Sequence, residues 1–234
     1  MKEGGDMDRT ILKDECDLSS KIQGRILDYD IIVIGHMRCN RYFNENPEKS
    51  LRGFPLTCTS VLVKGKGYVL LIDPTHRNCA EDFYFDLNRR TGLFPEDITH
   101  CYCTHEHIDH QYGLNYFPKA TWLAAKPVVE KLSNSEYITP NRILEAEGEF
   151  LPGVYSVPLP GHTIAQHGVA FIHEGRIVIA AGDATKTKYH FRDNSPDPSD
   201  EDTEAAVRSV YYIKKVTDIV IPGHDNLIIN TRVI

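Results

Sequence analysis

Several features are missing from this 234-residue sequence, and each absence narrows the classes of protein to consider. No run of about 18 apolar residues occurs, so the sequence predicts no transmembrane helix and no membrane partner. Nor is there an internal repeat, a low-complexity tract or a linker rich in proline, glycine and serine. One folded domain over residues 28–234, preceded by a polar N-terminal segment over residues 1–27, is therefore expected.

An excess of basic charge is also missing. Lys and Arg number 26 against 33 Asp and Glu, which gives a formal net charge of -7. This balance argues against long nucleic acid as a partner. The first 20 residues are acidic and have no apolar core, unlike a secretory signal, so a cytoplasmic location is expected.

The cysteines lack the paired spacing of a zinc ribbon. Six are present, at positions 16, 39, 58, 79, 101 and 103, and no two form a CxxC pair. In a cytoplasmic protein of this size they are expected to be reduced and buried thiols.

The amino-acid composition, with 41% hydrophobic and 25% charged residues, is that of an ordinary globular protein and predicts a packed core. Apolar and β-branched runs predict strands over residues 30–35, 58–63, 68–73, 98–103, 120–125, 168–172, 176–181 and 218–222. Helices are expected over 80–91, 127–132 and 199–216, the last opened by a capping box of Ser199 and Asp202. Hairpins followed by alternating strands and helices favour α/β layers.

The most informative segment is HEHIDH, residues 105–110, directly after a predicted strand. Histidines two positions apart cannot share one face of a helix, so the segment must turn at the strand end. There His105 and His107 can converge on one ion, while Asp109 and His110 reach a second point nearby. Imidazole nitrogen and carboxylate oxygen suit zinc, iron, manganese or cobalt.

Three later fragments each place one further ligand-type residue beside glycine. They are PGHT with His162, AAGD with Asp183 and PGHD with His224, and glycine lets the backbone turn sharply there. The set divides into His105, His107 and His162 for one ion and Asp109, His110 and His224 for another. Asp183 stands between them, with a carboxylate able to bridge both.

In this order of ligand-type residues the chain resembles the metallo-β-lactamase superfamily from about Cys58 to His224. The resemblance implies a four-layer αββα sandwich with two divalent metal ions at one edge, zinc first by ligand type and iron or manganese as alternatives. It also implies that Asp73, in the fragment LIDP, supports the metal loop without being a ligand.

A two-metal site of this kind implies a hydrolase that uses a metal-bridging hydroxide on a small ester, lactone or thioester. Asp109 is then expected to orient the nucleophile, accept its proton and protonate the leaving group. Two alternatives remain open: a phosphodiesterase or nuclease of the same fold, and an inactive metal-binding module. Metal identity, substrate identity and oligomeric state are not fixed by the sequence.

Among compact members, the chain resembles the N-acyl-homoserine lactonases in its ligand order and in PGHT. It also resembles metallo-β-lactamase domain-containing protein 1 at residues 180–183, 189–193 and 221–224, which would imply nuclease-like or other unusual hydrolysis. The lactonases carry a catalytic tyrosine three residues after the bridging aspartate, where this chain has Lys186 and its nearest tyrosine is Tyr189. Lys186 and Tyr189 are therefore the candidate substrate-binding residues.

Overall fold

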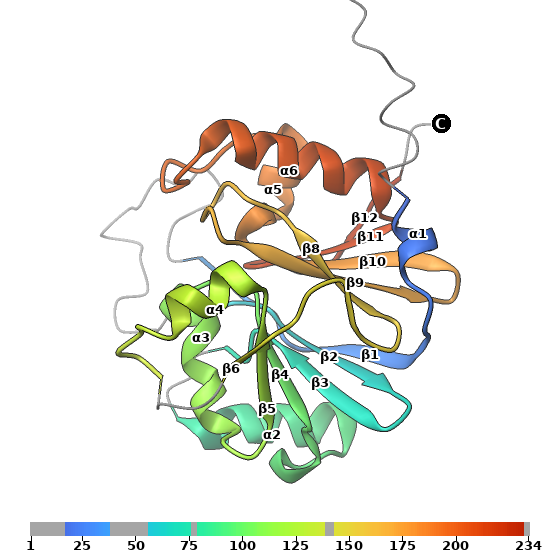
Figure 1. The fold of residues 1–234 in the computed structure, drawn as a ribbon, viewed down its shortest axis with the longest axis vertical. Coiled ribbons are helices and arrows are strands. Elements are labelled where there is room, and N and C mark those ends of the chain that lie inside the picture. Colours follow the sequence, from blue (N-terminus) through green and yellow to red (C-terminus); the bar gives the residue numbers. More distant parts are fainter. Residues whose placement is uncertain (1–16, 38–55, 76–78, 139–142, 232–234) are drawn as a thin grey trace, which may run out of the picture.

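Two mixed sheets packed face to face form the centre of the molecule, with helices on both outer sides (Figure 1). The structure is a computed structural model that describes residues 17–37, 56–75, 79–138 and 143–231. Figure 1 shows the layers in order from α6 at the top, through the two sheets, to α2 at the bottom. The expected αββα sandwich is confirmed.

The first sheet has six strands in the order of the chain. They are β1 (Ile26–Val33), β2 (Ser60–Gly65), β3 (Tyr68–Ile72), β4 (His100–Cys103), β5 (Thr121–Ala124) and β6 (Ile143–Glu145). Strands β1, β2 and β3 pair antiparallel, whereas β3 to β6 run parallel. The parallel strands therefore end at one common edge of the sheet.

The second sheet has the order β12-β11-β10-β9-β8-β7. Its strands are β7 (Glu149–Leu151), β8 (Val154–Pro158), β9 (His167–His173), β10 (Arg176–Gly182), β11 (Ile219–Pro222) and β12 (Ile228–Ile229). Among the described strands of this sheet, only β10 and β11 pair in parallel, so both reach the same edge.

Helices cover the outer faces. They are α1 (Leu18–Lys21), α2 (Ala80–Thr91), α3 (Ile108–Gln111), α4 (Lys126–Leu132), α5 (Lys188–Asp193) and α6 (Thr203–Val216). Single 3-10 turns lie at η1 (Pro95–Asp97), η2 (Tyr112–Tyr116) and η3 (Asp183–Thr185). The predicted helix over 80–91 is confirmed: Glu81 and Asp82 lie in its first turn, and Gly92 ends it in the left-handed region at φ 73°.

Alternation along the strands produces three apolar interfaces, one between each pair of neighbouring layers. In β3, Leu70 and Ile72 face the other sheet, while Leu71 packs under α2. In β10, Val178 also faces the first sheet, and Ile179 packs under α6. Because both faces of these strands are buried, they read as continuous apolar runs, which is why the sequence predicted them.

The start of α6 differs from its prediction. The helix begins at Thr203, and Asp202 is its N-cap, accepting a hydrogen bond from the Ala205 N–H at 2.9 Å. Ser199 does not cap it, because its hydroxyl contacts Lys186 and Asp197 instead. The predicted capping box was therefore wrong.

The cysteine prediction holds for part of the chain. Cys58, Cys101 and Cys103 are free and buried, as expected, whereas Cys79 is free but exposed at the start of α2. Its side chain precedes the helix and therefore does not enter the core. Cys16 and Cys39 lie outside the described residues.

Most of the predicted polar N-terminal segment, residues 1–16, lies outside the described residues. From residue 17 onward the chain packs on the second sheet, since Leu18 and Ile22 are buried in the cluster under α6. The division into this segment and one domain stays a prediction. Within the described ranges, no helix combines the length and apolar character that crossing a bilayer requires.

Candidate metal centre

The side chains singled out by the sequence gather at the edge where strands of both sheets end. His105 and His107 follow β4, Asp183 follows β10, and His224 follows β11. His162 lies in the connection between β8 and β9. In layered α/β proteins, ligands bind outside the carboxyl ends of the strands, so this edge is the expected place for a site.

One group consists of His105, His107, His162 and Asp183, whose candidate ligand atoms all lie within 4.8 Å of one another. The Nδ1 atom of His107 lies 3.2 Å from Nε2 of His105 and 2.9 Å from Nε2 of His162. His107 is exposed, whereas the other three are buried. The group therefore opens to solvent at His107.

The second group consists of Asp109, His110 and His224, again with ligand atoms within 4.8 Å. The Oδ2 atom of Asp109 lies 3.3 Å from Nε2 of His224 and 3.7 Å from Nε2 of His110. All three residues are buried. The short helix α3 positions Asp109 and His110 one after the other, directly behind the His107 turn.

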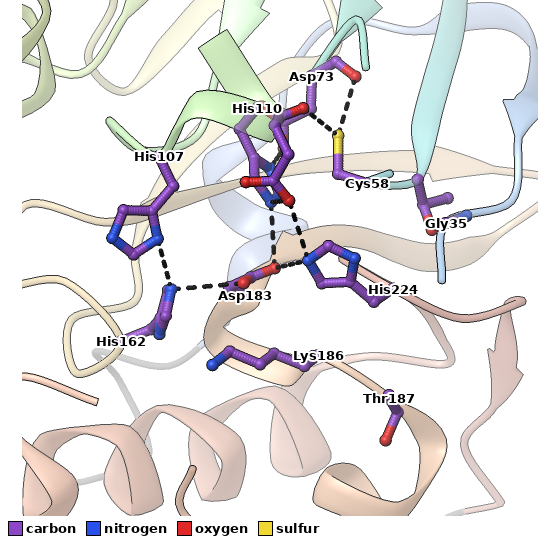
Figure 2. A network of polar contacts seen from close by, with 12 residues as sticks. Gly35, Cys58, Asp73, His107, His110, His162, Asp183, Lys186, Thr187 and His224 are labelled. Carbon is purple, nitrogen blue, oxygen red and sulfur yellow. Dashed lines mark hydrogen bonds and ion pairs between the residues drawn. The ribbon is translucent and has the colours of Figure 1, made fainter. Parts of the chain in front are cut away.

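Asp183 joins the two groups. Its Oδ2 lies 3.4 Å from Nε2 of His162, while its Oδ1 lies 3.2 Å from Nε2 of His110 and 3.3 Å from Nε2 of His224. Figure 2 shows this carboxylate in the centre of the site, with the three imidazoles around it. The grouping predicted from the sequence is the one that the fold brings together.

Atoms facing one another in this centre lack hydrogen bonds. Among the described residues, Oδ2 of Asp109, Nε2 of His110 and Oδ1 of Asp183 are buried and make none. Leaving such atoms unsatisfied costs roughly 1–3 kcal/mol each. A cation between them would supply the missing partner, so the residues present fit a divalent metal ion by donor type and by position.

Burial and facing charges shift the pKa values of these groups. Burial lowers the pKa of His105 well below its usual value, and the charge of His110 adds to the shift. For Asp183, burial opposes ionisation, but the facing imidazoles of His224 and His110 hold its pKa well below the usual range. A neutral imidazole and an ionised carboxylate are the protonation states that bind metal.

The outer nitrogens of several rings are held in place, which turns the other nitrogen toward the centre. The contacts are His110 Nδ1 with Asp73 Oδ2 at 2.8 Å, His162 Nδ1 with Asp200 Oδ1 at 3.1 Å, and His224 Nδ1 with the Thr57 carbonyl at 3.0 Å. Metal-binding histidines usually have such a partner, which fixes the tautomer and the ring orientation.

Asp73 supports the loop that carries the first histidines. Besides contacting His110, its carboxylate accepts hydrogen bonds from the Thr104 backbone N–H at 2.8 Å and from the Thr104 hydroxyl at 2.7 Å. Asp73 belongs to neither group of candidate ligands. The geometry is that of a support.

Two glycines near Asp183 stand where no larger residue fits. A Cβ on Gly223 would collide with Oδ1 of Asp183, and one on Gly182 would meet the side chain of Thr104. Gly182 also has a φ of 52°, which side chains other than glycine rarely adopt. The small residues beside the ligand-type residues are thus required by close approach.

The structure places the two candidate substrate-binding residues in different surroundings. Lys186 is 5% exposed, and its ammonium group contacts Ser199 and Asp197. Tyr189 lies in a groove of about 1030 Å³ beside α5, α6 and β12, close to the Lys188 and Arg192 cations. None of the candidate ligands lines that groove. A contact of either residue with substrate stays a prediction.

Asp200 and Thr57 were not identified from the sequence. Asp200 is one of several acidic residues in a polar stretch before α6, and Thr57 contributes a backbone carbonyl. Neither has a local signature, because both reach the site only through tertiary folding.

Comparison with known proteins gives one family. A family model described as "Metallo-beta-lactamase superfamily" matches residues 53–224. An N-acyl homoserine lactonase of Bacillus cereus is 32% identical over 160 residues, which cover 62% of this chain and 63% of that protein. Metallo-beta-lactamase domain-containing protein 1 of Xenopus laevis is 33% identical over 139 residues, 57% of this chain and 56% of that protein. The chain therefore spans less than two thirds of the length of these curated relatives.

A solved structure of an N-acyl homoserine lactone hydrolase, with the product N-hexanoyl-L-homoserine at its catalytic metal center, has the same fold. Its TM-score is 0.62 at 20% identity, and the match covers 86% of this chain and 94% of that one. The resemblance predicted from the ligand order is confirmed at the level of family and fold. The chain belongs to the metallo-beta-lactamase superfamily.

Proposed function

We propose that the protein is a metal-dependent hydrolase that acts on a small ester, lactone or thioester. It would hold two divalent cations, with zinc as the first candidate and iron or manganese as alternatives. The observation that carries this proposal is the pair of ligand groups sharing Asp183, with buried polar atoms that lack partners between them.

Under this proposal, His105, His107 and His162 hold one cation and Asp109, His110 and His224 hold the other, with Asp183 shared. Bound cations of this kind would lower the pKa of a coordinated water and polarise the carbonyl oxygen of the substrate. The protein fixes the positions of these ligands through Asp73, Asp200 and Thr57.

Asp109 is assigned to proton transfer. Its Oδ2 is buried, makes no hydrogen bond and faces the centre beside His224. A carboxylate so placed can accept the proton of an attacking water and return it to the leaving oxygen or sulfur. His107 and Ile108 are exposed beside it, which leaves an approach for a small molecule.

The relatives support a lactone as the first substrate to test, because the Bacillus cereus protein is named an N-acyl homoserine lactonase. Ring opening releases a proton, so acid release can be followed directly in weakly buffered solution. The assay compares zinc-loaded protein, the same protein stripped with EDTA, and Asp183→Ala.

Metal-dependent acid release from an acyl-homoserine lactone, absent in Asp183→Ala, is the expected result. If lactone, thioester and p-nitrophenyl ester all fail with metal-loaded protein, the ester-type hydrolase is refuted. Turnover of bis(p-nitrophenyl) phosphate alone would assign the phosphodiesterase alternative instead.

A further inference from the structure

Lys186 is buried in a polar network behind the metal centre. Its Nζ donates a hydrogen bond to the Ser199 hydroxyl at 2.8 Å and lies 3.2 Å from Oδ1 of Asp197. Lys186 and Asp197 help to line a cavity of about 10 Å³. This is close to the smallest cavity that holds a single water molecule. The partners that the structure gives this ammonium group therefore lie within the protein.

Asp197 connects Lys186 to the turn that carries Asp200. Its Oδ1 also accepts hydrogen bonds from the Ser199 backbone N–H and hydroxyl, and its own N–H donates to Oδ2 of Asp200 at 2.7 Å. Burial opposes ionisation of Asp197, but hydrogen bonds from His190 and Ser199, with the Lys186 charge, hold its pKa well below the usual range. An ionised Asp197 thus anchors the turn that carries Asp200.

Asp200 in turn holds a candidate metal ligand. Its side chain is 5% exposed, and Oδ1 lies 3.1 Å from Nδ1 of His162. The same turn docks on the His162 loop through its backbone, because the Glu201 N–H donates to the His162 carbonyl at 3.2 Å. A proton on Nδ1 shared with Asp200 leaves the Nε2 lone pair directed toward His107 and Asp183.

We propose that Lys186 is a positioning residue for the cation held by His105, His107 and His162. Its charge keeps Asp197 in place, and Asp197 keeps Asp200 against Nδ1 of His162, which sets the tautomer of that ring. Figure 2 shows Lys186 on the side of Asp183 opposite His110. This inference rests on the proposed function only in taking a metal ion as the partner of Nε2.

The second group should be spared. The backbone carbonyl of Lys186 accepts a hydrogen bond from the His224 N–H at 2.7 Å, and a change of side chain leaves that bond in place. Lys186→Met keeps most of the stem length and removes the charge. Its effect is therefore expected at one cation site and not at the other.

The first test uses metal-free protein, so its outcome is independent of the proposed function. Imidazole ¹⁵N spectra report which nitrogen of His162 carries the proton. A His162→Gln variant assigns the signal. Wild type should show the Nδ1-protonated form, whereas Lys186→Met and Asp200→Asn should show a mixture. The proposal is overturned if Asp200→Asn changes the tautomer and Lys186→Met does not.

The second test titrates the protein with Zn²⁺ alone against a competing chelator. Changes of such outer residues typically weaken metal binding by about 10- to 100-fold, so Lys186→Met and Asp200→Asn should weaken one of two sites by that factor. Lys188→Met, an exposed lysine on α5, is the matched control and should bind both ions as wild type does.

The positioning role would be overturned if Lys186→Met bound Zn²⁺ at both sites as tightly as wild type does. It would also be overturned if the variant weakened both sites by the same factor. The double variant Lys186→Met/Asp200→Asn should bind Zn²⁺ no more weakly than whichever single variant binds it less tightly, because both changes act through one chain of contacts. Wild type that binds no zinc at all would refute the proposed function, and the tautomer spectra would still decide the role of Lys186.

Discussion

The carboxylate of Asp109 faces His224 and His110 with an oxygen that makes no hydrogen bond. We expect Asp109→Asn to lower kcat by about 10²- to 10⁴-fold, because an amide cannot accept and return the proton. The variant should retain metal, since the amide oxygen and two histidines still face the site. Steady-state rates and metal content measured on the same preparation check this.

Asp225→Asn is the control for Asp109. Asp225 follows His224 directly, but its carboxylate accepts hydrogen bonds from the Lys188 and Asn226 N–H groups, at 3.1 Å and 2.8 Å. It should hydrolyse substrate at the rate of wild type. An Asp109→Asn rate equal to wild type, at full metal content, would remove Asp109 from proton transfer.

Asp73 acts on stability as well as on the site, because its carboxylate accepts hydrogen bonds from Thr104 and His110 in a buried place. Asp73→Asn should lower the free energy of unfolding of metal-free protein by about 1.5–3 kcal/mol, the range for hydrogen bonds to a charged group. Asparagine tolerates the positive φ of 46° at this position as aspartate does, so backbone strain adds nothing.

Urea unfolding measures the effect of Asp73→Asn, with Asp30→Asn as the comparison. Asp30 pairs with Arg90 where both side chains are about one-third exposed, at 32% and 36%. Removing that surface pair should cost less than about 1 kcal/mol. Equal losses in the two variants would contradict the supporting role of Asp73.

At the scale of elements, the start of α6 depends on one side chain. Asp202 accepts a hydrogen bond from the Ala205 N–H, which otherwise has no partner within the helix. Asp202→Ala should lower the free energy of unfolding by about 1 kcal/mol, the usual value of an N-cap. Glu204→Ala, an exposed change in the first turn of the same helix, should stay within about 0.5 kcal/mol of wild type. Urea unfolding that cannot separate the two variants would show that the cap contributes nothing.

Element interiors were predictable and element ends were not. The strands in both hairpins and the helix over 80–91 follow from apolar period and turn residues, and the structure places them within one or two residues. Strand β12 has two residues and β6 has three, too short to show a period, and they are defined only by their partners. The first turn of α6 was misplaced because Ser199, a good cap by type, is used by Lys186.

The same contrast holds for the site. The grouping around Asp183 was predictable because HEHIDH and three glycine-flanked residues fall at strand ends in a fixed order. The role of Lys186 was not, since burial decides it and a lysine in a polar stretch gives no sign of burial. Asp200 was missed for the same reason.

At the scale of the molecule, each group of ligands joins the two sheets. His105 and His107 follow a strand of the first sheet, whereas Asp183 follows a strand of the second. Likewise Asp109 and His110 come from the first half of the sandwich and His224 from the second. A cation in either group would therefore add a cross-link between the two halves, beyond the apolar core between the sheets and hydrogen bonds such as that from the Thr59 N–H to the Gly223 carbonyl at 2.6 Å.

Metal removal should consequently lower the melting temperature. A ligand present at about 100 times its Kd stabilises the folded state by about 2.7 kcal/mol per site, which for a chain of this size is a shift of about 5–10 °C. Calorimetry in buffered free Zn²⁺ and in EDTA measures the difference. The double variant His107→Gln/His224→Gln, with one ligand lost from each group, should melt at a temperature that zinc changes little. If wild type melts at the same temperature in zinc and in EDTA, the two groups do not hold cations that link the sheets.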